Sequence, residues 1–147
     1  MLKKFCLVLC FSTLLFASSS TFSNPQPTFD NPRKVVYSLN SGNEDIVNST
    51  IGSMYNILKE YPSESLKLVV VVYGKALRNF KNDSSQAFLD RVKSLMQYDV
   101  EFIACKNTMN TMNWKESDFI DGMNFTQAGI VEIIERQVDG YIPIIAY

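Results

Sequence analysis

The hydrophobic pattern of the chain alternates between short apolar runs and longer segments with one apolar face. Three runs are rich in β-branched residues and predict strands: KVVYSL at 34–39, LKLVVVVY at 66–73 and VEFIA at 100–104. Within the second run, residues 69–72 are apolar without alternation. That pattern is typical of a parallel strand whose two faces are both buried. A further strand is expected over 141–145.

Helical periodicity fills the segments between these strands. The first helix begins at Glu44 or Asp45, because an acidic residue suits the positive end of the helix dipole, and Tyr61-Pro62 ends it. The second is capped within residues 82–84 and continues through Gln97 with one apolar face. Two amphipathic helices are therefore expected in the first two thirds of the chain.

The last third of the chain is less regular. Asn107 or Thr108 caps a short helix, and residues 116–129 are irregular apart from a short strand near 123–125. A final helix covers residues 130–138. The alternation of strand and helix predicts an open parallel sheet with helices on both faces, a single-domain α/β three-layer sandwich.

The first 23 residues have the pattern of a targeting sequence. Lys3 and Lys4 precede an apolar run from Phe5 to Ala17, and small residues follow it. The run has roughly 13 residues, which is short of the ~20 that span a bilayer. We therefore predict a signal peptide over residues 1–23, cleaved near its end, rather than an uncleaved anchor. Export would place a mature chain without a membrane span in the periplasm.

The mature chain is expected to have two parts. Residues 24–33 contain three prolines and no periodicity, so we interpret them as an extended leader. Residues 34–147 then form the one α/β domain.

Composition excludes several classes of function. The chain has no histidine, so Ser-His-Asp and Cys-His catalysis, His-ligated zinc and His-ligated haem cannot be built from it alone. Loss of Lys3 and Lys4 with the signal peptide leaves 12 basic and 15 acidic residues, a net charge of about −3. Nucleic acid requires a basic surface, so no nucleic-acid partner is expected. A reactive nucleophile must be activated by a helix end, a cation or a carboxylate.

Cysteine usage draws attention to one thiol. Removal of the signal peptide would remove Cys6 and Cys10 and leave only Cys105. A single cysteine cannot form an intrachain disulfide. Three interpretations stay open: a buried inert side chain, a thiol paired with another molecule, or a reactive thiol.

The position of Cys105 permits reactivity without histidine. It follows a predicted strand and precedes a predicted helix. A helix N-terminus lowers a thiol pKa, and so does a neighbouring cation such as Lys106. The resulting thiolate is the nucleophilic form. Packing remains the competing interpretation, because free cysteine is among the most buried residue types.

Other candidate residues follow from the predicted sheet. Open parallel sheets place their sites at the carboxyl ends of strands, where the strand order reverses. Segments 40–43, 74–75 and 105–108 lie at such ends. Lys75 and Arg78 either attract an anion or are ordinary solvated charges. The candidate ligand-binding residues are Asn40, Lys75, Lys106, Asn107 and Thr108.

Soft sulfur ligands suggest an alternative. Cys105, Met109 and Met112 have the i, i+4, i+7 spacing of one helix face, and a thiolate with thioethers suits Cu(I). The competing interpretation is that these methionines fill the core. We assign no metal ligand and no cofactor.

Four stretches follow one another in a recognisable order: VVYSLNSG (35–42), LVVVVYGKAL (68–77), VEFIACKNTM (100–109) and AGIVEIIERQVDGYIPI (128–144). Together they resemble the DsrE/DsrF-like family of small sulfur-metabolism proteins. The resemblance implies a compact α/β fold with a mostly parallel five-stranded sheet, assembled into oligomers that are commonly trimers or hexamers. In the sulfur-relay members a cysteine accepts sulfane sulfur as a persulfide and passes it on, and Cys105 stands at the matching position.

Residues and resemblance together favour a periplasmic sulfur carrier or sulfurtransferase-like protein that uses Cys105. Its partners would be further copies of itself and a sulfur donor or acceptor protein. Two alternatives stay open: a non-catalytic module that binds a small ligand or Cu(I), and a structural homo-oligomer with a buried cysteine.

Overall fold

The computed structural model describes residues 20–62 and 64–146. Most of the predicted signal peptide, residues 1–19, therefore lies outside the described residues. Residues 20–32 contain neither helix nor strand. The guanidinium of Arg33 holds this segment against the domain, donating hydrogen bonds to the carbonyls of Ser23 (2.6 Å) and Pro25 (2.8 Å).

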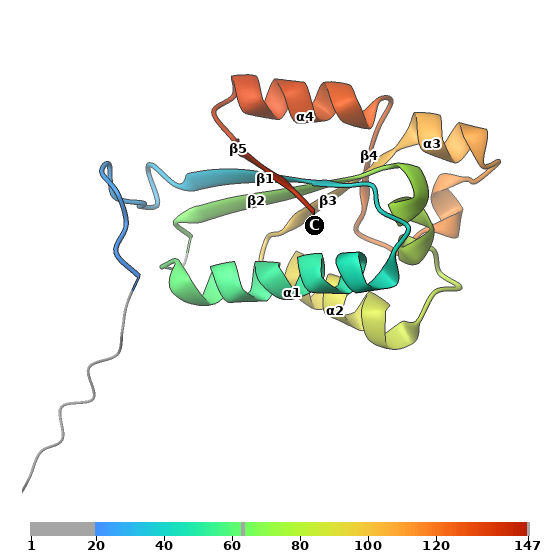
Figure 1. Ribbon diagram of the computed structural model, residues 1–147, viewed down its shortest axis with the longest axis horizontal. Helices are drawn as coiled ribbons and strands as arrows, with labels where there is room; N and C mark the ends of the chain where they lie inside the picture. Colours follow the sequence, from blue (N-terminus) through green and yellow to red (C-terminus); the bar gives the residue numbers. More distant parts are fainter. Residues whose placement is uncertain (1–19, 63, 147) are drawn as a thin grey trace, which may run out of the picture.

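A parallel sheet of five strands forms the middle of the domain (Figure 1). The strands are β1 (Arg33–Leu39), β2 (Leu66–Val72), β3 (Glu101–Cys105), β4 (Asn124–Thr126) and β5 (Ile142–Ile145). Their order is β4-β3-β2-β1-β5, and each neighbouring pair is parallel. The sequence predicted a mostly parallel sheet; the five described strands are parallel throughout.

Helices cover both faces of this sheet. The helices α1 (Glu44–Glu60) and α2 (Gln86–Met96) lie on one face, and α4 (Gly129–Val138) lies on the other (Figure 1). The short elements η1 (Gly74–Phe80), α3 (Lys106–Thr111) and η2 (Glu116–Asp118) complete the chain. The predicted three-layer α/β sandwich is confirmed.

The central strands are apolar on both faces because each face supports a separate core. Val70 and Val72 belong to the larger core, beneath α1 and α2. Val69 and Val71 belong to the smaller core beneath α4, together with Ile103. Full burial of such side chains stabilises a fold by about 1.5–3 kcal/mol each, so β2 anchors both layers.

Two helix starts differ from the predicted ones. Residues 82–84 do not cap α2, whose N-cap is Ser85, because the Ser84 hydroxyl instead donates to the Arg78 carbonyl at 2.9 Å. Asn107 and Thr108 lie inside α3, whose N-cap is Cys105. Strand β3 leads directly into α3 without a loop, and this places the sulfur at the helix start.

Within the described part of the chain, none of the helices has both the length and the apolar character needed to cross a bilayer.

Candidate functional site at Cys105

Strand β3 carries Cys105 to the carboxyl edge of the sheet. Its side chain lies on the same face as that of Ile103, two residues earlier, and therefore beneath α4. The strand order reverses between β1 and β5, so Cys105 lies away from the expected crevice. The residue is 6% exposed, so the sulfur is largely covered.

Gly129 provides the main contact to the sulfur. Its backbone N–H, at the first residue of α4, donates a hydrogen bond to Cys105 Sγ at 3.3 Å. A Cβ at Gly129 would lie 3.2 Å from both Cys105 Cβ and Val71 Cγ1, which is tighter than ordinary packing. Glycine thus permits the positive end of α4 to approach the thiol.

Thr108 contributes from the first turn of α3. Its Oγ1 accepts a hydrogen bond from the Gly74 N–H at 3.0 Å, which joins the ends of β2 and β3. A hydroxyl that accepts in this way still has its own proton to donate, and the Thr108 hydroxyl is one of the groups that lower the pKa of Cys105.

A pair of hydrogen bonds holds the segment after β4 against α3. The Asn107 N–H donates to the Gln127 carbonyl at 3.1 Å, and the Gln127 side-chain amide donates to Asn107 Oδ1 at 2.7 Å. The same carbonyl lies 4.0 Å from Cys105 Sγ, at the outer limit for a weak S–H donor. Gln127 therefore fixes the segment that leads to Gly129.

The environment favours the ionised thiol. Burial raises the pKa of Cys105. Hydrogen bonds from the Gly129 backbone, from the Thr108 backbone and hydroxyl, and from the Asn107 backbone together lower this pKa by more than burial raises it. The net pKa lies below the ordinary value of a cysteine thiol. Backbone amides take the role that a histidine has in other thiol sites.

An ion-pair cluster at the far end of α4 fixes the orientation of that helix. Arg136 pairs with Glu101 at the start of β3 (3.0 Å) and with Glu132 on α4 (2.7 Å), and it donates to the Tyr141 hydroxyl at 3.3 Å. These partners raise the pKa of the guanidinium, which stays charged. With Arg136 tied to the beginning of β3, the opposite end of α4 meets Cys105 at the end of β3.

The remaining predicted site residues point elsewhere. Lys106 pairs with Glu116 at 2.7 Å rather than with the thiol. The exposed Asn40 accepts the Ala76 N–H through its carbonyl at 3.3 Å. Lys75 lines a cleft of which Cys105 is not part. Of the five candidate ligand-binding residues, Asn107 and Thr108 are thus the two beside the sulfur.

The three sulfur-bearing side chains of the Cu(I) alternative have separate surroundings. Met109 is buried in the larger core, whereas Cys105 lies beneath α4. Met112 is exposed and lines the same cleft as Lys75. Their helical spacing therefore reflects packing, because Cys105 precedes α3 instead of lying on one of its faces.

Sequence reasoning missed Gly129 and Gln127. Both lie more than twenty positions from Cys105 and reach it because β4 pairs with β3 in register, with Thr126 opposite Cys105. The only local signal was Gly129 beside the predicted last helix, and a glycine at a helix start has several explanations.

The chain matches the DsrE/DsrF-like family over residues 34–144. No curated protein matches it. Among solved structures, a protein of unknown function from Methanobacterium thermoautotrophicum is 26% identical, with a TM-score of 0.72, over 77% of this chain and 98% of the other.

Two further structures share the fold at lower identity. The ychN protein from E. coli is 18% identical, with a TM-score of 0.61, over 78% of this chain and 99% of the other. A conserved protein of unknown function from Bacteroides thetaiotaomicron is 12% identical, with a TM-score of 0.56, over 76% of this chain and 93% of the other. The family match covers the sheet from β1 to β5, including Cys105 and Gly129. The chain therefore belongs to the DsrE/DsrF-like family, which is generally linked to sulfur metabolism.

Proposed function

We propose that this protein is an exported, periplasmic sulfur carrier that accepts sulfane sulfur on Cys105 as a persulfide. One observation carries the proposal: Cys105 is the N-cap residue of α3, and its sulfur accepts a hydrogen bond from the first amide of α4, which lowers its pKa. Membership of a sulfur-metabolism family supplies the substrate class. The pattern of residues 1–23 supports the export step.

The transfer reaction requires no cofactor and no external oxidant. The Cys105 thiolate attacks the outer sulfur of a donor persulfide, RS–SH. A new sulfur–sulfur bond forms on Cys105, the donor's sulfur–sulfur bond breaks, and the donor leaves as the thiolate RS⁻ with the electron pair. Amide donors that stabilise the Cys105 thiolate also suit the persulfide anion, which carries its charge on the outer sulfur.

Access to the thiol sets the rate in this proposal. Because Cys105 is 6% exposed, a donor reaches Sγ only when the covering segment 126–129 moves aside. That segment is held by the hydrogen bonds between Asn107 and Gln127. The Gln127 side chain in this segment is exposed.

Persulfide transfer is tested by mass spectrometry of the folded protein after incubation with glutathione persulfide. We expect one added sulfur atom on the peptide that contains Cys105, and none at that peptide in the Cys105→Ser variant. Alkylation of the native protein in parallel shows whether Cys105 is accessible. An accessible Cys105 that gains no sulfur rejects the proposal. A thiol that is alkylated only after denaturation also rejects it, in favour of a structural cysteine.

We further propose that the protein assembles as a homo-oligomer through α4 and β5. Four aliphatic side chains of α4 are between 50% and 76% exposed, and two isoleucines of the adjoining edge strand are exposed with them. An exposed apolar surface next to an unpaired strand edge is typical of a protein interface. The exposed residues are Ile130, Val131, Ile134, Val138, Ile142 and Ile145.

A further inference from the structure

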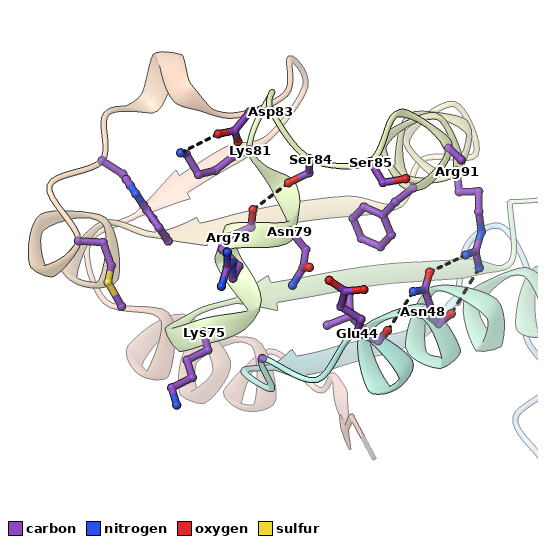
Figure 2. Close-up of a pocket in the computed structure, with 16 residues that line it drawn as sticks. Glu44, Asn48, Lys75, Arg78, Asn79, Lys81, Asp83, Ser84, Ser85 and Arg91 are labelled. Atoms are coloured by element: carbon purple, nitrogen blue, oxygen red, sulfur yellow. Dashed lines mark hydrogen bonds and ion pairs between the residues drawn. The ribbon is translucent and has the colours of Figure 1, made fainter.

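A cleft of about 810 Å³ opens between η1, α1 and α2 (Figure 2). Its volume is typical of small-molecule sites, which have roughly 300–1,000 Å³. Cys105 does not line it, so the sulfur chemistry proposed above makes no use of it.

Basic side chains dominate the charged groups of the cleft. Four of its described lining residues are basic, against two acidic ones, Glu44 and Asp83. Lys81 pairs with Asp83 at 3.5 Å. Lys75 and Arg78 form no ion pair with any residue among 20–62 and 64–146. Among the described residues, two exposed cations thus stand at the cleft without an ion-pair partner, as does the carboxylate of Glu44.

The start of α2 adds a fixed positive potential at the same place. Its N-cap, Ser85, makes no side-chain capping hydrogen bond, and its first turn contains no acidic residue. The Ser84 hydroxyl donates to the Arg78 carbonyl at 2.9 Å, which keeps Arg78 next to the start of α2. The Phe88 N–H already donates to the Ser85 carbonyl at 3.0 Å. The first-turn amides without a partner among the described residues are therefore those of Gln86 and Ala87. Such amides are donors that oxyanions prefer.

The rest of the cleft is suited to an uncharged organic group. Neutral hydrogen-bonding side chains of Asn48 and Asn79 line it, and Asn48 is held by Arg91 through a 2.9 Å hydrogen bond. Figure 2 shows Glu44 and Asn48 on the α1 side and Arg78 and Ser84 across from them. The apolar lining residues are Val47, Phe88, Met112 and Trp114.

We propose that this cleft binds a small organic anion with a phosphate-type tetrahedral group. Its oxygens lie at Arg78, Lys75 and the first amides of α2. Its uncharged body lies against the apolar lining, of which Met112 is 43% exposed whereas Val47 and Phe88 are buried. This site is separate from Cys105 and does not depend on the proposed sulfur transfer.

Calorimetric titration of the full chain with phenyl phosphate at low ionic strength tests the proposal. We expect saturable binding that weakens as salt is added. Arg78→Gln and Lys75→Gln should each weaken it by about tenfold, since each removes a charge-assisted contact. The matched control, Lys93→Gln, removes an exposed lysine on α2 outside the cleft and should leave the affinity unchanged.

Two further probes, neutral phenol and the smaller inorganic phosphate, test the anionic part and the organic part of the proposed ligand separately. Phenol should bind far more weakly than phenyl phosphate, and inorganic phosphate should bind more weakly than phenyl phosphate. Equal affinity for phosphate and phenyl phosphate overturns the proposed organic part. Unchanged phenyl phosphate affinity in both Arg78→Gln and Lys75→Gln overturns the site itself, provided that both variants keep the wild-type unfolding midpoint.

Discussion

Cys105 is the N-cap residue of α3, a position where helices usually have serine, threonine, aspartate or asparagine, although its sulfur makes no capping hydrogen bond to α3. A neutral thiol is a poor substitute for the side-chain oxygens of these residues, whereas a thiolate resembles an aspartate carboxylate. The first amide of α4 faces the same atom from the other side. Two helix N-termini thus meet at Cys105, and both favour its ionised form.

Thr108→Val should raise the pKa of Cys105. The substitution keeps the shape of the side chain but removes the hydroxyl donor that lowers the thiol pKa. It also removes the acceptor of the Gly74 N–H, at a cost of about 1 kcal/mol in unfolding free energy. The pH dependence of the rate of Cys105 alkylation measures the change, and its midpoint should move to higher pH.

Thr111→Val is the control for that substitution. Thr111 lies on the exposed side of α3, and its hydroxyl donates to the Asn107 carbonyl at 3.0 Å rather than toward the thiol. Its alkylation midpoint should match that of the wild type. A Thr108→Val midpoint that also matches the wild type would show that the hydroxyl does not act on the sulfur.

Part of the site could be predicted from local sequence. A cysteine after an apolar run and before a helix indicates a thiol at a helix start, and Asn107 and Thr108 follow from adjacency. Lys106 shows the limit of that reasoning. Its closeness in sequence suggested that it would place a cation beside the thiol, but the Lys106 ammonium pairs with Glu116 instead. The direction of a long side chain depends on tertiary partners that a local pattern does not contain.

At the scale of elements, the strands were predicted well because their burial leaves a strong local signature. The run at 69–72 is apolar on both faces because β2 lies between two cores. The short strand β4 and the start of α3 were harder, since three residues carry little periodicity and β3 passes into α3 without turn residues. Gly129 and Gln127 reach the sulfur through β3–β4 pairing, which only the fold specifies.

Gly129→Ala should loosen the junction between α4 and β3. The new methyl group would press on Cys105 Cβ and Val71 Cγ1, each 3.2 Å away, and push the first amide of α4 from the sulfur. We expect a loss of about 1 kcal/mol in unfolding free energy and a higher thiol pKa. Urea unfolding and the alkylation profile measure the two effects.

Gly52→Ala provides the comparison within the same chain. Gly52 lies in the interior of α1, where the nearest atom to a new Cβ is Arg91 Nη2 at 3.9 Å. This variant should gain about 0.5–1 kcal/mol in unfolding free energy with no change in thiol pKa. If Gly129→Ala and Gly52→Ala changed the unfolding free energy and the thiol pKa by the same amounts, the proposed close approach at Gly129 would be contradicted.

At the scale of the whole molecule, the two helical layers differ in their surfaces. The layer of α1 and α2 has the basic cleft, and α4 has the exposed aliphatic residues. The sulfur lies beneath α4, so assembly through α4 would take place close to the thiol without occupying the cleft. This separation predicts that ligand binding in the cleft and self-association can be altered independently.

Ile134→Asp should weaken self-association. Ile134 is half exposed on α4, and a charge there would oppose burial of the apolar surface in an interface. Light scattering after size exclusion should show an oligomer for the wild type and a smaller species for the variant. Tyr98→Asp introduces the same charge in place of another exposed large side chain. The molar mass of this variant in solution should equal that of the wild type. A monomeric wild type, or an unchanged Ile134→Asp variant, would contradict an interface on α4.

The central claim is that backbone amides lower the pKa of the Cys105 thiol without histidine. The most direct measurement is the ultraviolet absorbance of the thiolate as a function of pH, recorded as the difference between the wild type and Cys105→Ser, which cancels Cys6 and Cys10. The account predicts a midpoint below that of an ordinary cysteine thiol. Because the folded pKa is depressed, the stabilisation by the thiolate should be fully present above the unfolded pKa, and it should be lost as pH falls through the folded midpoint. A midpoint at or above the ordinary value would contradict the account.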